Sequence, residues 1–284
     1  MDEKHTLIFL HGMGDTHPTE GFEGLWAKIR ESYDRRDDRS EGDFERRYAK
    51  CFVDWHAVTE EAKSTVFDRA FAPMMAQRSL PGAAIHPLAF GRTFFTFFLG
   101  DVVAYVDESP NNIRTTVWAK MKNDLARGGR YSIIAHSLGS VIAFDFLYHL
   151  FIENTLFDPV QDPAANIAGL QERFAGLYTM GSPIGLFMLR KGSLWKRDED
   201  RRRGGPPFSE IKNPIPAGRP WQNFWDKEDV IAYPLEQLFA TNAGNAGRNL
   251  HDVKVDIGLP DPISSHIRYW KSAEVAAKIV ETLG

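Results

Sequence analysis

The strongest constraint on the fold of this chain is the alternation of short apolar runs with segments of helical periodicity. Residues 6–10 form an unbroken apolar run that ends at His11, as is typical of strands buried on both faces. In residues 20–33, apolar side chains recur at helical spacing. Because this order of strand and helix repeats along the chain, we expect an α/β fold with a mainly parallel central sheet flanked by helices.

The same patterns place the remaining elements. We expect the charged stretch 35–47 to be a solvated loop. Further helices are expected from Pro110 to before Gly128, and over residues 138–151 and 275–283. Further strands are expected at residues 48–53, 131–135, 176–180 and 253–256, and near Phe224 and Trp225. A length of 284 residues suits one domain, 1–284, in which segments 57–107 and 184–220 are insertions that could form a lid or cap.

Charge and cysteine content narrow the possible partners and compartment. Lys and Arg number 34 against 38 Asp and Glu, so the net charge of −4 gives no reason to expect nucleic acid as a partner. Cys51 is the only cysteine, and we expect a buried apolar side chain there. A chain that cannot form an internal disulfide, with no signal-peptide or membrane-spanning pattern, is expected in the cytoplasm.

One short string carries the clearest chemical signal. Ala135-His-Ser-Leu-Gly139 lies between an expected strand and an expected helix, where a nucleophile elbow must lie. A tight turn of this kind needs small residues two positions before and after the serine, and Ala135 and Gly139 meet that need. We therefore expect Ser137 to be a nucleophile at the positive end of a helix dipole.

A glycine-rich turn follows the first strand. His11-Gly-Met-Gly14 lacks the Lys and the Ser or Thr of a phosphate loop and the spacing of a dinucleotide fingerprint. Beside the Ser137 elbow, such a turn can aim a backbone N–H at the same crevice. The backbone N–H groups of Met13 and Leu138 are therefore the expected oxyanion donors.

A serine nucleophile needs a base, and the base needs an acid that orients it. Three histidines follow Ser137. His149 lies within the helix that leads away from the serine, and His251 precedes the expected strand at its wrong end, so His266 is the expected base. The acid should follow the strand near Phe224 and Trp225. Spacing alone leaves this position open between Asp226 and Asp229, with Glu228 as the third choice.

Taken together, these strings resemble the α/β-hydrolase superfamily and are most similar to its lipase and esterase branch. The resemblance rests on His11-Gly, the Ser137 string, Met180-Gly-Ser-Pro183, Asp229-Val-Ile-Ala-Tyr-Pro234 and Ser265-His266. It implies an α/β-hydrolase fold shortened at its N-terminal edge, because the first strand begins by residue 6. It also implies that Asp229 is the triad acid.

The resemblance implies cleavage of a carboxylic ester, which we expect to proceed through an acyl-enzyme. No metal or cofactor is expected, because the histidines lack paired metal-ligand spacing. The aromatic cluster 94–98 and the apolar run 184–188 suggest a small-molecule or lipid-like ester as substrate. An acyltransferase or thioesterase with the same triad is an alternative, as is a non-catalytic binding protein on this scaffold. The oligomeric state does not follow from the sequence.

Overall fold

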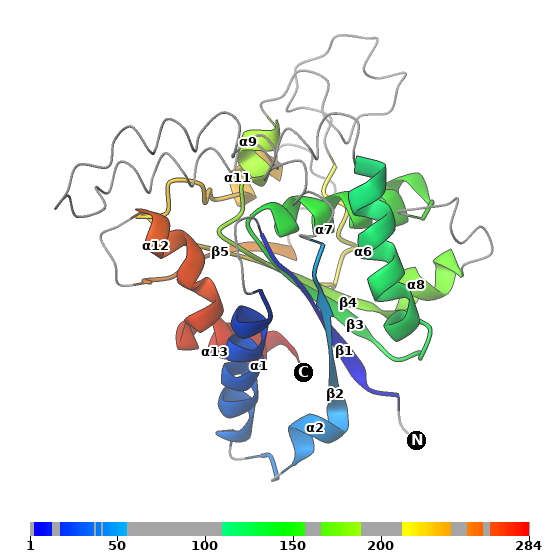
Figure 1. Cartoon of the computed structure of the whole chain (residues 1–284), viewed down its shortest axis with the longest axis horizontal. Helices are drawn as coiled ribbons and strands as arrows, with labels where there is room; N and C mark the ends of the chain where they lie inside the picture. The colour runs from blue at the N-terminus through cyan, green and yellow to red at the C-terminus, as the bar shows by residue number, and fades with distance from the viewer. Residues whose placement is uncertain are drawn as a thin grey trace, which may run out of the picture.

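In the part of the chain that the structure describes, the central sheet has six strands, all parallel, in the order β2-β1-β3-β4-β5-β6 (Figure 1). The structure is a computed structural model that describes residues 3–12, 18–36, 38–40, 42–55, 110–156, 166–188, 212–239, 249–257 and 262–283. The strands are β1 (His5–Leu10), β2 (Tyr48–Val53), β3 (Tyr131–His136), β4 (Phe174–Met180), β5 (Trp221–Trp225) and β6 (Leu250–Lys254).

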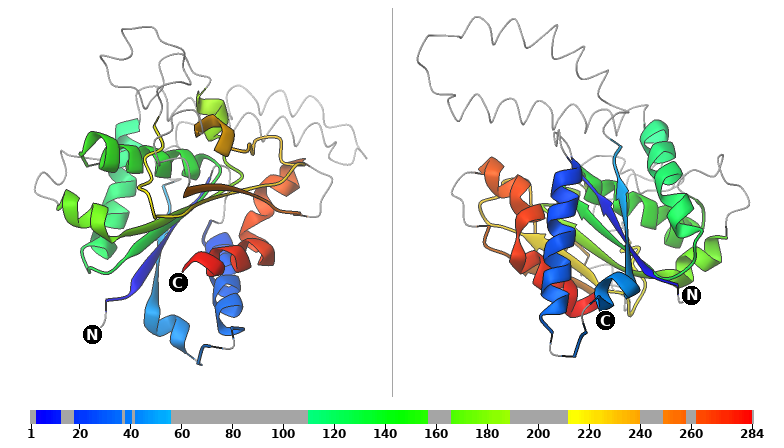
Figure 2. Two further views of the ribbon diagram at one scale, coloured as in Figure 1. Left: turned by 180° about the vertical axis from the view of Figure 1, so that it is seen from behind. Right: turned by 60° about the horizontal axis from the view of Figure 1, so that its bottom comes forward.

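Helices cover both faces of this sheet (Figure 2). One face carries α1 (Pro18–Asp34), α2 (Asp43–Arg47), the 3₁₀ turn η5 (Arg268–Lys271) and α13 (Ala273–Leu283). The other face carries α6 (Pro110–Leu125), α7 (Leu138–Tyr148), the π-helical turn η2 (His149–Glu153) and α8 (Ile167–Arg173). The short helices α9 (Ile184–Met188), α11 (Glu236–Phe239) and α12 (Pro262–Ile267) complete the described elements.

Strand β1 shows why the apolar runs are unbroken. Leu7 and Phe9 pack into the core beneath α1 and α13, whereas Ile8 and Leu10 pack into the core beneath α6 and α7. Successive strand residues point to opposite faces, so a strand between two helical layers needs apolar residues at every position. The expected α/β class with a parallel sheet between helices is therefore confirmed.

Three local predictions need correction. The stretch 35–47 is not entirely a loop, because its end forms α2 and buries Phe44 completely. The last strand begins at Leu250 and ends at Lys254, so it starts before the predicted 253–256. The expected helix 138–151 continues past Tyr148 as a π-helical turn. Segment 57–107 and residues 189–211 of segment 184–220 lie outside the described residues.

The strand order reverses between β1 and β3. From β1 the chain moves outward to β2 and then returns to the other side of β1, where β3, β4, β5 and β6 follow in sequence. In open parallel sheets, such a switch point leaves a crevice at the carboxyl ends of the two strands, and ligands bind there. His11 and Gly12 follow β1 at this point, and Ser137 follows β3.

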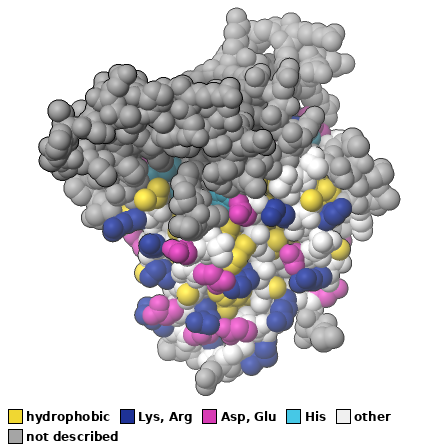
Figure 3. All heavy atoms as spheres, viewed as in Figure 1, with side chains coloured by type: hydrophobic (Ala, Val, Ile, Leu, Met, Phe, Trp, Pro, Cys, Tyr) yellow, Lys and Arg dark blue, Asp and Glu magenta, His cyan; other side chains and the backbone are white. Residues whose placement is uncertain are grey.

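On the face shown in Figure 3, described cationic and anionic side chains are interspersed. None of the described helices combines the length and apolar character needed to cross a bilayer.

Candidate active site

Ser137 occupies a strained turn between β3 and α7. Its backbone angles are φ 53° and ψ −129°, and Asn154 is the only other described non-glycine residue with a positive φ. Such a conformation costs about 1–3 kcal/mol and persists only where the surrounding structure enforces it. The Ser137 N–H donates to the Met180 carbonyl at the end of β4, 2.9 Å away, which ties the turn to the sheet.

Close packing around the turn explains the glycines of the two strings. A Cβ on Gly12 would overlap the Cβ of Ser137, and one on Gly139 would lie 2.7 Å from the Leu10 carbonyl oxygen. Both positions therefore exclude a side chain, because real Cβ atoms do not approach that closely. Ala135 takes the other small position, and its methyl group is fully buried in the core beneath α6 and α7.

The structure brings Ser137, His266 and Asp229 together in one hydrogen-bonded chain. His266 Nε2 lies 2.8 Å from Ser137 Oγ, and His266 Nδ1 lies 2.9 Å from Asp229 Oδ2 and 3.0 Å from Oδ1. These three residues come from the ends of β3 and β5 and from α12, and each is at most 3% exposed. Because a carboxylate can only accept, the ring proton lies on Nδ1, and Nε2 is left to accept from the serine hydroxyl.

The environment of Asp229 favours its charged form. Burial by itself raises the pKa of this carboxyl, but His266 and the backbone N–H of Ile231 outweigh it and hold the pKa below its usual value. The Ala232 N–H is 3.3 Å from the same oxygen as the Ile231 N–H. Asp229 is thus an ionised acceptor held in place by backbone donors.

Gly181 makes room for this pair. Its φ is +57°, and a Cβ there would lie 3.0 Å from Asp229 Oδ2 and 3.1 Å from His266 Nδ1. Its N–H donates to the Phe224 carbonyl at 3.1 Å, so the turn after β4 is joined to β5. Gly181 belongs to the Met180-Gly-Ser-Pro183 string, whose contact with the acid and the base could not be inferred from spacing.

The other acidic candidates have different partners. Asp226 is buried, but its carboxylate accepts from the backbone N–H groups of Glu228 at 2.8 Å and Ile257 at 2.6 Å. Asp226 therefore stabilises the backbone after β5 and links it to the backbone after β6. Glu228 pairs with neighbouring Lys227 at 3.3 Å, with both side chains well exposed. Of the three, Asp229 is the one that the structure places against His266.

The remaining histidines also lie elsewhere. His251 is within β6 rather than before it, with its side chain 64% exposed and 3.7 Å from Glu236. His149 lies beyond the end of α7 and contacts Glu153 and Asp145 at 2.8 and 3.6 Å. Neither is joined to Ser137 by a contact of the kind that His266 makes.

Comparison with protein-family models and with curated proteins finds no match for this chain. The site is therefore interpreted from its own geometry.

Of the two expected oxyanion donors, Leu138 lies within the described residues and Met13 does not. Leu138 is the first residue of α7, and the first N–H groups of a helix have no acceptor within the helix. His11, which precedes Met13, is completely buried, stacks on Trp55 with ring centroids 5.1 Å apart and lies 3.0 Å from Asp54. This support from the end of β2 was not predicted from the sequence.

The loop that carries Asp229 is fixed by residues of β5 and β6. Asn223 donates to the Tyr233 carbonyl at 2.9 Å and to the Asp252 carboxylate at 2.7 Å. The same carboxylate accepts from the N–H groups of Leu235 and Glu236, each at 2.8 Å. These polar side chains lie on strands, where their neighbours in space could not be read from sequence spacing.

The described residues contain no group of three or more His, Cys, Asp or Glu side chains placed to hold a metal ion. Cys51 is buried as expected, and burial raises the pKa of its thiol.

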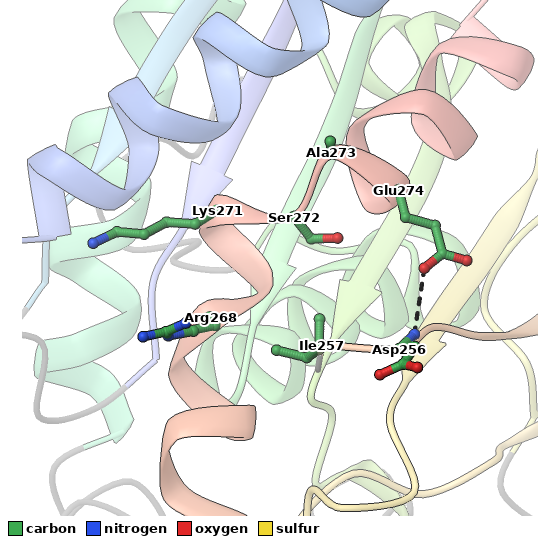
Figure 4. A pocket seen from close by; sticks show the side chains of 7 residues that line it. All are labelled: Asp256, Ile257, Arg268, Lys271, Ser272, Ala273 and Glu274. Atoms are coloured by element: carbon green, nitrogen blue, oxygen red, sulfur yellow. Dashed lines mark hydrogen bonds between the residues drawn. The ribbon is translucent and has the colours of Figure 1, made fainter. Parts of the chain in front are cut away.

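A hollow of about 350 Å³ lies beside α13, apart from Ser137, Asp229 and His266 (Figure 4). Figure 4 shows Arg268 and Lys271 pointing to one side of it, and on the other side the Asp256 N–H donates to Glu274 at 3.3 Å. The full lining is Asp256, Ile257, Arg268, Lys271, Ser272, Ala273 and Glu274.

Proposed function

We propose that this chain is a serine hydrolase of α/β-hydrolase fold that cleaves carboxylic esters through an acyl-enzyme. The observation that carries the proposal is the hydrogen-bonded chain from Ser137 Oγ through His266 to Asp229. Nucleophile, acid and base follow β3, β5 and β6 in the chain order typical of this fold.

In the proposed mechanism, His266 Nε2 takes the Ser137 proton while the serine oxygen attacks the ester carbonyl. Asp229 stabilises the imidazolium that forms, and the N–H groups of Leu138 and Met13 stabilise the oxyanion. The imidazolium then protonates the departing alcohol. Water activated by His266 attacks the acyl-enzyme, releases the acid and regenerates the Ser137 hydroxyl.

The strain at Ser137 supports this assignment. A buried serine that served packing alone would gain nothing from a positive φ. Here the turn costs free energy, and it directs Oγ toward a base. Strained backbone of this kind clusters at functional sites, where it presents a reacting group.

Exposed apolar side chains that neighbour triad residues in the sequence support an apolar ester as substrate. Three large apolar side chains are strongly exposed among the described residues: Val230 at 50%, Ile267 at 49% and Tyr233 at 39%. Val230 follows Asp229, and Ile267 follows His266. A Cβ on Gly185 of α9, in the predicted acyl-site run 184–188, would lie 3.4 Å from the Cβ of Tyr233, so these two residues are close in space. The aromatic cluster 94–98 lies outside the described residues.

Hydrolysis of nitrophenyl esters of increasing acyl length tests the proposal. Ser137→Ala should lower kcat by ~10⁴-fold or more, because the nucleophile is lost. Ser132→Ala is the matched control: it makes the same change in β3, where the hydroxyl contacts His5 instead, and should keep kcat near that of the unmodified chain. A Ser137→Ala variant with full activity would contradict the assignment.

Product analysis with added alcohol or thiol separates hydrolysis from acyl transfer.

A further inference from the structure

His136, the residue before the nucleophile, contacts the candidate base. It is the last residue of β3 and is 4% exposed. Its Nε2 lies 2.6 Å from the backbone carbonyl oxygen of His266, and the two imidazole centroids are 4.8 Å apart. The rings of Tyr269 and Trp270 enclose it, with centroids 5.8 and 5.5 Å away.

The surroundings of His136 define its protonation. Burial, with a smaller contribution from the neighbouring His266, lowers the pKa of its imidazole to about 3. The ring is therefore neutral at pH 7. Because its partner is a carbonyl oxygen, the single ring proton lies on Nε2 and is donated to His266. A neutral ring also adds no repulsion against an imidazolium that forms at His266.

The element that carries His266 needs such support. Helix α12 spans six residues, Pro262–Ile267, and a helix of that length is not stable on its own hydrogen bonds. The position of the imidazole therefore depends on tertiary contacts. The bond from His136 reaches the backbone of His266 itself, across 130 residues of sequence.

The contacts form a closed ring. Ser137 is covalently bonded to His136, His136 donates to the backbone of His266, and the His266 side chain returns to Ser137 Oγ. A shift of α12 would therefore break a buried hydrogen bond next to the nucleophile, and leaving such groups unsatisfied is costly.

We propose that His136 is a positioning residue, whose Nε2–H holds the His266 backbone so that the imidazole stays within reach of Ser137. The inference rests on the proposed serine hydrolase function. It deepens that function by assigning to the residue before the nucleophile a role in placing the base.

Two substitutions of similar size separate hydrogen bonding from packing. In His136→Gln, the side-chain amide nitrogen is as many bonds from Cα as Nε2 of histidine, so the donor is kept. In His136→Met, similar volume is kept without a donor. We expect the Met variant to lower kcat by ~10- to 100-fold with little change in KM, since a small misplacement of a catalytic group has an effect of this order. The Gln variant should recover most of that loss at a similar Tm.

His136→Asn provides a second variant without the contact, in case the Met variant does not fold. Its amide ends one bond short of the Nε2 position, so kcat should fall as it does for Met. Equal kcat values for the unmodified, Gln and Met proteins would overturn the positioning role but not the proposed function. The same conclusion would follow if kcat fell equally in folded Gln and Met variants. An unmodified chain that neither hydrolyses esters nor reacts at Ser137 would overturn the proposed function, and this inference with it.

Discussion

Among the described residues, two Asp–His contacts involve a buried carboxylate, and one of them continues to a strained serine. At the carboxyl edge of the sheet, Asp229 contacts one nitrogen of His266, and the other nitrogen faces Ser137. Near the far end of α7, Asp145 Oδ2 accepts two hydrogen bonds from Arg114, at 2.6 and 2.9 Å, and Oδ1 lies 3.6 Å from His149.

The two histidines differ in what lies on their second nitrogen. His149 Nδ1 is 2.8 Å from the Glu153 carboxylate and 3.3 Å from the Thr155 hydroxyl. His149 thus lies between two carboxylates, whereas His266 lies between a carboxylate and a hydroxyl. A buried Asp–His contact therefore does not by itself mark an active site. The group beyond the imidazole, and the backbone that presents it, distinguish the two regions.

The largest expected difference between the two regions is in catalysis. Asp229→Asn should lower kcat for ester hydrolysis by about 10⁴-fold, because an amide cannot hold the imidazole in the correct tautomer or stabilise the imidazolium. Asp145→Asn is the same chemical change at the other contact and should leave kcat per folded molecule near that of the unmodified chain. Steady-state kinetics on both variants measures this. Similar losses in the two variants would remove the distinction.

The second expected difference is in stability. Here Asp145→Asn should cause the larger loss of unfolding free energy, whereas Asp229→Asn causes the larger loss of kcat. Asp145→Asn removes the buried carboxylate that accepts two hydrogen bonds from the partly buried Arg114 guanidinium, and breaking such a pair costs about 3 kcal/mol of unfolding free energy. Asp229→Asn should cost less, because the Ile231 and Ala232 N–H groups can still donate to the amide oxygen. Urea denaturation followed by circular dichroism measures both values. A larger loss in Asp229→Asn would show that the triad region is the more important one for stability.

The sequence predicts the centre of the sheet better than its edge. Strand β3 is buried at all six positions, and its sequence is mostly apolar, so its start and the elbow after it were predicted correctly. Strand β6 lies at the edge of the described sheet, with only Leu250 buried. Because His251 and Asp252 are polar, the sequence pattern predicted a later start for this strand. His251 was therefore expected to precede the strand.

The candidate site was predictable as far as chain order allows. A small residue on each side of Ser137 and a histidine after the last strand are local signals. The choice of Asp229 over Asp226 depends instead on which carboxylate turns toward α12 and which accepts the Ile257 N–H. The contact of His136 with His266 joins residues 130 positions apart, and no local pattern encodes it.

The most direct test of the account is to find which residue of the folded chain reacts with a fluorophosphonate probe. The probe phosphonylates an activated serine, and mass spectrometry of the digested protein identifies the modified peptide. We expect one modification, on Ser137, that is absent in Ser137→Ala and much slower in Asp229→Asn. Stable modification of a different residue, or a folded chain in which Ser137 stays unmodified, would contradict it.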